Sequence, residues 1–109
     1  MTMINTVMTR TILIVDDEAE IRRSLGGVLR DEGFRVAEAR GGPQALEKVA
    51  ESPPDVILLD IWMKGMDGLE TLERLKVEAP EIPVVMITGH GNVETAVKSL
   101  KLGAFDFIE

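Results

Sequence analysis

The chain contains no cysteine and few basic residues: 12 Lys and Arg stand against 19 Asp and Glu, which gives a net charge of -7 over 109 residues. Without cysteine there is neither a disulfide framework nor a thiolate metal site, as expected in a reducing cytoplasm. The excess of acid disfavours binding to a phosphate backbone, so any DNA contact belongs to another domain. No apolar run approaches the ~20 residues that span a bilayer.

The length suits one domain with one core, and a hydrophobic content of 45% is ordinary for a soluble globular protein. The first residues lack the charged region and long apolar core of a signal peptide. Met8 stands just before the first apolar run. We therefore expect residues 1–9 to be a leader, vector-derived or disordered, and residues 10–109 to form the domain.

Apolar runs of strand length alternate with stretches that carry apolar residues at helical spacing, which predicts an α/β fold with helices on both faces of a parallel sheet. Gly33 and Gly103 stand where helices should stop, and Asn92 can cap the fourth helix. The expected strands are 12–15, 34–39, 56–59, 84–87 and 105–108, and the expected helical faces lie within 21–29, 45–50, 69–75 and 93–100.

The order of the strands follows from their polarity. The first, third and fourth runs are unbroken and apolar, as in buried central strands, whereas Phe34–Ala39 alternates with polar residues, as in an edge strand. This favours a doubly wound five-stranded sheet with the order 2-1-3-4-5. The crevice for a ligand would then lie at the carboxyl ends of strands one and three.

Three of the runs end in residues that can bind or accept a phosphoryl group: Asp16 and Asp17, Asp60, and Thr88. Parallel strands bring these ends to one edge of the sheet, so the four residues should share one cleft. Three clustered carboxylates repel one another and need a cation, most simply Mg²⁺. Because a carboxylate beside a bound metal can accept a phosphoryl group, the pattern suggests a phosphorylation switch.

Two of these residues, Asp17 and Asp60, also have a simpler interpretation when taken alone. Asp17 could cap the helix that follows it, and Asp60 could be a solvated turn residue. His90, the sole histidine, is flanked by glycines and is interpreted as a solvated loop side chain. The six methionines lack groove-like spacing and are interpreted as core filler.

Five short motifs carry a resemblance to a known family: Ile14–Glu18, Leu58–Ile61, Met66–Gly68, Thr88–Gly89 and Gly103–Phe107. With these motifs the chain resembles, over residues 10–109, the receiver domain of two-component response regulators, which is CheY-like in fold. The segment 89–108 is similar to receivers of NtrC- and NtrX-type transcriptional regulators.

The resemblance assigns roles to particular residues. It implies that Asp60 is the phosphoacceptor and one of the metal-site acids, that Asp17 is a direct Mg²⁺ ligand, and that Asp16 supports the ion through water. The backbone carbonyl of Trp62 would be a further protein ligand. Thr88 would donate its hydroxyl to a phosphoryl oxygen, and Phe107 would be the aromatic switch residue, which can signal only by packing.

The implied function is that of a switch and not of an enzyme, apart from slow self-phosphorylation and self-dephosphorylation. A sensor histidine kinase would supply the phosphoryl group. The surface of the fourth helix and fifth strand would then control an attached output domain, an ATPase with a DNA-binding module that activates transcription.

Two features depart from the family pattern. Lys64 stands where receivers usually have a proline, which predicts a less rigid acceptor loop. The family's phosphate-binding lysine would follow Glu109, and a fifth helix would come after it. We therefore expect that these residues are an excerpt of a longer chain, or that the domain associates, for example as a homodimer, through the uncovered apolar side of 105–108 and the first helix.

Two other functions compete with this one. Phosphatases of the haloacid dehalogenase type also use a strand-end Asp nucleophile with Mg²⁺, but they need a second acid two residues later, where this chain has Trp62. A phosphorylation-silent interaction module is the other alternative, favoured by Lys64 and by the missing lysine.

Overall fold

The computed structural model describes residues 9–88 and 93–109. Within these residues strands and helices alternate along the chain, as the sequence predicted. The elements are β1 (Thr11–Val15), α1 (Ala19–Asp31), β2 (Arg35–Ala39), α2 (Gly42–Glu51), β3 (Val56–Asp60), α3 (Gly68–Glu78), β4 (Val84–Ile87), α4 (Val93–Lys101) and β5 (Asp106–Ile108).

The strands form one parallel sheet with the order β2-β1-β3-β4-β5, which confirms both the predicted order and the edge position of β2. Ile14 of β1 lies beside Leu58 of β3, and Asp60 at the end of β3 lies beside Ile87 of β4. The register therefore brings the carboxyl ends of the three central strands to the same edge.

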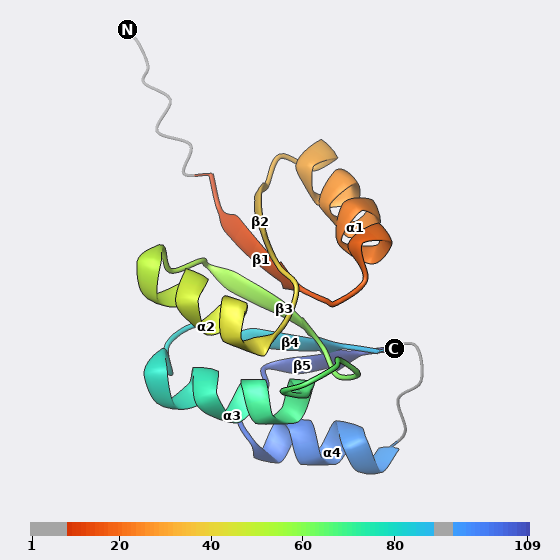
Figure 1. Ribbon diagram of the computed structural model, residues 1–109, viewed down its shortest axis with the longest axis vertical. Helices are drawn as coiled ribbons and strands as arrows, with labels where there is room; N and C mark the ends of the chain where they lie inside the picture. The colour runs from red at the N-terminus through yellow and green to blue at the C-terminus, as the bar shows by residue number, and fades with distance from the viewer. Residues whose placement is uncertain (1–8, 89–92) are drawn as a thin grey trace, which may run out of the picture.

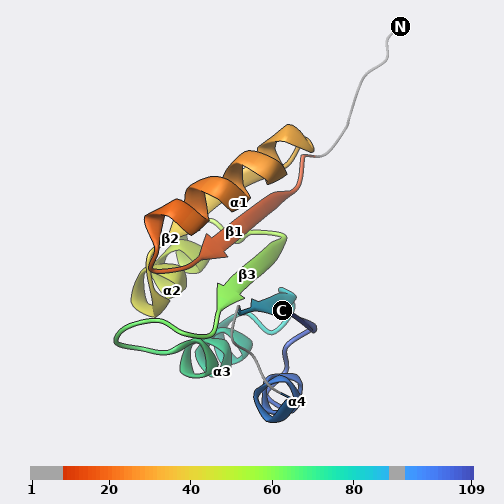
Figure 2. The ribbon, with the colours of Figure 1, turned by 90° about the vertical axis from the view of Figure 1, so that its right-hand side faces the viewer.

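The helices cover the sheet from both sides. Figure 1 shows α1 on one side of the sheet and α2, α3 and α4 on the other, and Figure 2 shows the same arrangement from the side. Connections between parallel strands are right-handed, so the side on which a helix lies depends on the direction in which the chain moves across the sheet. The chain moves one way from β1 to β2 and the other way from β2 onward, which places α1 opposite the later helices. The doubly wound architecture is therefore confirmed.

The main core lies between the sheet and the helices α2 and α3. Alternate residues of β1, β3 and β4 point into it because side chains of a strand alternate between its two faces. The fully buried large side chains of this cluster include Leu13, Val15, Ile57, Leu59, Leu72, Leu75, Val84 and Met86.

The predicted helix stops are confirmed. Gly33 has a φ of 97° and Gly103 a φ of 105°, a backbone region that glycine adopts without steric cost. The N-terminus of α3 has a cap that the sequence analysis did not identify: the Asp67 side chain accepts a hydrogen bond of 2.8 Å from the amide of Glu70. The prediction that Asn92 caps α4 lies outside the described residues, as does His90.

Part of the apolar surface stays exposed. The large apolar side chains of α4 are exposed, and the buried residue of this helix is Ser99, whose hydroxyl donates to the carbonyl of Thr95 at 2.9 Å. No helix in the described part of the chain is long and apolar enough to cross a membrane. The exposed side chains on α4, on and beside β5, and on α1 include Val93, Val97, Leu100, Phe105, Ile108 and Val28.

Candidate functional site

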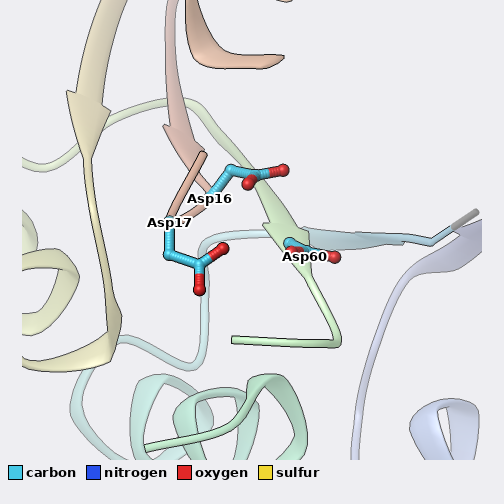
Figure 3. A group of neighbouring side chains, drawn as sticks. All are labelled: Asp16, Asp17 and Asp60. Atoms are coloured by element: carbon cyan, nitrogen blue, oxygen red, sulfur yellow. The ribbon is translucent and has the colours of Figure 1, made fainter. Parts of the chain in front are cut away.

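Three carboxylates meet at the carboxyl edge of the sheet. Asp16 and Asp17 follow β1, and Asp60 is the last residue of β3. One oxygen atom from each of the three side chains lies within 4.8 Å of the others. Figure 3 shows the three side chains gathered at the ends of these two strands. The structure thus brings together the acids that the sequence placed at one edge.

The environment of Asp60 penalises its charge. Burial, and next the negative charge of Asp16, raises the pKa of Asp60 from its ordinary value of 3.8 to about 6. A weak hydrogen bond of 3.3 Å from the amide of Trp62 to Oδ1 of Asp60 lowers the pKa and offsets part of this rise. Asp60 is therefore a half-buried carboxylate whose ionised form is disfavoured by its surroundings.

Asp16 is the most buried of the three acids, with 9% of its surface exposed. Burial raises its pKa, and the charges of Asp17 and Glu18 act in the same direction. The amide of Glu18 donates to Oδ1 of Asp16 at 2.8 Å and, with the guanidinium of Arg22, opposes that rise. Asp16 is held in place by its own loop but is not neutralised by it.

Asp17 belongs to the site and does not cap the following helix. The N-cap residue of α1 is Glu18, which makes no side-chain capping bond. Oδ2 of Asp17 instead accepts a hydrogen bond of 3.2 Å from the backbone amide of Lys64, in the loop between β3 and α3. The capping interpretation of Asp17 is therefore wrong for this structure.

Thr88 is 2% exposed, and its amide donates to the carbonyl of Ile108 at 3.1 Å, so it is anchored beside β5. Phe107 is partly buried and packs against the main core. One cleft brings Thr88 together with two of the acids and with neighbouring apolar side chains; it is lined by Asp16, Glu18, Ile21, Asp60, Trp62, Ile87 and Thr88.

The sequence analysis did not identify Arg22, a residue of α1 that hydrogen-bonds to the backbone of the site. Its Nη1 donates to the backbone carbonyl of Asp16 at 2.7 Å, and its Nε donates to Oε1 of Glu38 at 3.1 Å. One signal pointed to it: Glu38 is an acid inside a strand and is paired with the buried Ile14 of β1. An acid in that position calls for a nearby cation.

Comparison with known proteins agrees with this geometry. Residues 12–109 match the family model described as the response regulator receiver domain. The chain belongs to this family. It is 53% identical over 104 residues to the nitrogen assimilation regulatory protein NtrX of Azorhizobium caulinodans, covering 94% of this chain and 23% of that protein. It is 48% identical over 97 residues to the transcriptional regulatory protein ZraR of Klebsiella oxytoca, covering 89% and 22%.

Solved receiver structures have the same fold. The receiver domain of NtrX from Brucella abortus superimposes with a TM-score of 0.85 at 48% identity, covering 90% of this chain and 83% of that one. A CheY-like receiver protein from Methanospirillum hungatei gives 0.87 at 34% identity, covering 93% and 81%. The chain spans less than a quarter of the length of the curated NtrX and ZraR proteins it matches. The similarity to NtrX confirms the predicted subfamily resemblance.

Proposed function

We propose that this receiver domain accepts a phosphoryl group on Asp60 from a phosphohistidine of a sensor histidine kinase, with Mg²⁺ in the acidic cluster. The observation that carries the proposal is the convergence of three carboxylates within 4.8 Å at the ends of β1 and β3. Such a cluster is electrostatically costly unless a cation or a proton compensates it.

The residues present fit Mg²⁺. This ion prefers oxygen donors, takes one or two carboxylates and keeps several of its waters. Asp16, Asp17 and Asp60 supply the carboxylate oxygens, and the raised pKa values of Asp16 and Asp60 mark negative charge that the protein itself does not neutralise. The carbonyl of Trp62 as a further ligand stays a prediction. When bound, the ion would neutralise charge on the phosphoryl oxygens.

Asp60 supplies the nucleophile. Its pKa of about 6 lies below neutral pH, so the ionised and reactive form of Asp60 predominates there. An oxygen of its carboxylate attacks phosphorus, a new O–P bond forms, and the P–N bond to the kinase imidazole breaks. The bonding electrons leave with the imidazole nitrogen, which then binds a proton. The product is an acyl phosphate on Asp60.

The buried Thr88 and the partly buried Phe107 would transmit the change. A phosphoryl group adds about -1.5 to -2 charges at the cleft, and Thr88 is one of the residues that line that cleft. If the hydroxyl of Thr88 turns to donate to a phosphoryl oxygen, Thr88 would move toward the site. Ile108 of β5 would move with it, because the amide of Thr88 donates to the carbonyl of Ile108. Phe107 would then repack, and the exposed surface of α4 and β5 would change.

The partners are inferred from the relatives. NtrX and ZraR are named as regulatory proteins, and each is more than four times as long as the segment this chain matches. We infer that residues 10–109 act as the receiver of such a regulator in the cytoplasm and control an output domain with ATPase and DNA-binding parts. The reaction on this domain would be stoichiometric and not a turnover reaction.

The test uses the chain with Mg²⁺ and acetyl phosphate, followed by intact-mass measurement. We expect one added phosphoryl group, no addition to Asp60→Asn, and normal addition to the control Asp31→Asn at the exposed end of α1. A chain that gains nothing would be the phosphorylation-silent module. Release of many phosphates per chain would indicate a phosphatase. Phosphorylation of Asp60→Asn at the normal level would contradict the assignment of the acceptor.

A further inference from the structure

The loops that follow β1 and β3 are joined by a hydrogen bond across the acidic cluster. The backbone amide of Lys64 donates to Oδ2 of Asp17 at 3.2 Å, although the two residues are 47 positions apart in the sequence. Lys64 stands where the family pattern usually has a proline. A proline has no amide hydrogen and could not make this bond.

We propose that the backbone N–H of Lys64 positions the Asp17 carboxylate, and that the residue type at position 64 thereby sets the affinity of the cluster for Mg²⁺. The inference rests on the proposed function, because it concerns the same site. Lys64 is a positioning residue that acts through Asp17 and not a ligand itself.

The physical reason lies in the rotational freedom of a partly exposed carboxylate in a loop. Asp17 lies between β1 and α1, where no regular backbone ladder fixes its side chain. A donor on Oδ2 restricts the rotation of the carboxylate and so fixes where its oxygens lie relative to Asp16 and Asp60. Hydrogen bonds that orient metal-binding carboxylates typically change metal affinity by about 10- to 100-fold.

Position 64 also contributes a charge. The exposed ammonium group of Lys64 is carried by the same loop as the donor and opposes the approach of a cation. The backbone N–H and the side-chain charge therefore act in opposite directions on Mg²⁺ affinity. Two substitutions separate them: Lys64→Ala keeps the N–H and removes the charge, whereas Lys64→Pro removes both.

The experiment is a Mg²⁺ titration of the metal-stripped chain, followed through the fluorescence of Trp62, the only tryptophan and a cleft residue. For Lys64→Pro we expect the affinity to fall roughly tenfold, near the lower end of the range because the bond is exposed. For Lys64→Ala we expect affinity up to about twofold tighter than in the unmodified chain. Urea denaturation in EDTA checks that both variants fold.

A coupling measurement distinguishes positioning from a general disturbance of the loop. In an Asp17→Ala background there is no carboxylate to position, so adding Lys64→Pro should change the remaining Mg²⁺ affinity by less than about twofold. If Lys64→Pro fails to fold, a backbone ester at position 64 removes the N–H without a proline ring, and the same tenfold loss is expected.

The outcomes separate this inference from the proposed function. If Lys64→Pro or the ester binds Mg²⁺ as tightly as the unmodified chain, or more tightly, the N–H does not position Asp17 and the inference is overturned. An equal loss in the Asp17→Ala background overturns it too. If the unmodified chain shows no response to millimolar Mg²⁺, the proposed function itself fails.

Discussion

Gly68 and Asp60 lie in direct backbone contact where α3 begins against the end of β3. The amide of Gly68 donates to the carbonyl of Ile61 at 2.9 Å, and a Cβ atom placed on Gly68 would overlap the carbonyl oxygen of Asp60 and the Cα of Ile61. Glycine is therefore needed at position 68 because the backbone of Asp60 and Ile61 occupies the space of a side chain.

Gly68→Ala should destabilise the domain by about 1 to 3 kcal/mol, because the clash is with backbone that cannot rotate away. The matched control is Gly27→Ala in α1, where nothing lies within 4 Å of the added Cβ. That substitution should stabilise the domain by about 0.5 to 1 kcal/mol, since alanine favours a helix interior over glycine. Urea denaturation measures both, and equal effects of the two substitutions would contradict this account.

The strands and their order could be predicted from the sequence because burial imposes a simple pattern on them. The unbroken run Ile12–Val15 and the alternating run Phe34–Ala39 marked a central strand and an edge strand, and both assignments are confirmed. The convergence of Asp16, Asp17 and Asp60 followed from the same parallel topology. The pattern of apolar residues in the strands, which reflects their burial, therefore also located the candidate site.

Other features could not be read from the sequence. The bond from Lys64 to Asp17 uses a backbone amide, which every residue except proline possesses, so no side-chain pattern reveals it. The apolar residues of α4 share one side of that helix, yet Val93, Val97 and Leu100 are exposed. Helical periodicity shows which residues share a face, but not whether that face meets the sheet.

Asp60→Asn should stabilise the folded domain at neutral pH. The folded state raises the pKa of Asp60 to about 6 from its ordinary 3.8, so it binds the proton more tightly than the unfolded chain does. The stabilisation that protonated Asp60 provides is full below about pH 4 and is lost as the pH rises through 6. The neutral amide avoids this loss and should gain about 1 to 2 kcal/mol at pH 7 after solvent screening is allowed for.

The measurement is urea denaturation of the unmodified chain and of Asp60→Asn between pH 4 and 8, in EDTA to exclude metal. The difference in unfolding free energy should grow from pH 4 to pH 7 and then level off. Asp31→Asn, at the exposed end of α1, serves as the control and should show no such growth. If the difference in unfolding free energy between Asp60→Asn and the unmodified chain does not depend on pH, the charge of Asp60 is not the cause of that difference.

Arg22→Ala should destabilise the domain by about 1 to 3 kcal/mol. The side chain of Arg22 is 17% exposed, and the substitution removes its bonds to the carbonyl of Asp16 and to the carboxylate of Glu38. The loss stays moderate because Glu38 keeps a second cation, Arg30, at 3.7 Å. The neighbouring Arg23 is exposed, so Arg23→Ala is the matched control and should change stability by no more than about 0.5 kcal/mol.

A double-mutant cycle shows whether the two bonds of Arg22 act together. If Arg22 stabilises the domain chiefly through Glu38, Arg22→Ala and Glu38→Ala should be strongly non-additive, with a coupling of at least ~0.5 kcal/mol. If the bond to the Asp16 carbonyl dominates, Arg22→Ala should remain costly in a Glu38→Ala background. The short distance of 2.7 Å to that carbonyl favours the second result, since it ties α1 directly to the loop that carries the acids. If Arg22→Ala and Arg23→Ala are equally stable, neither the bond to Glu38 nor the bond to the Asp16 carbonyl stabilises the domain.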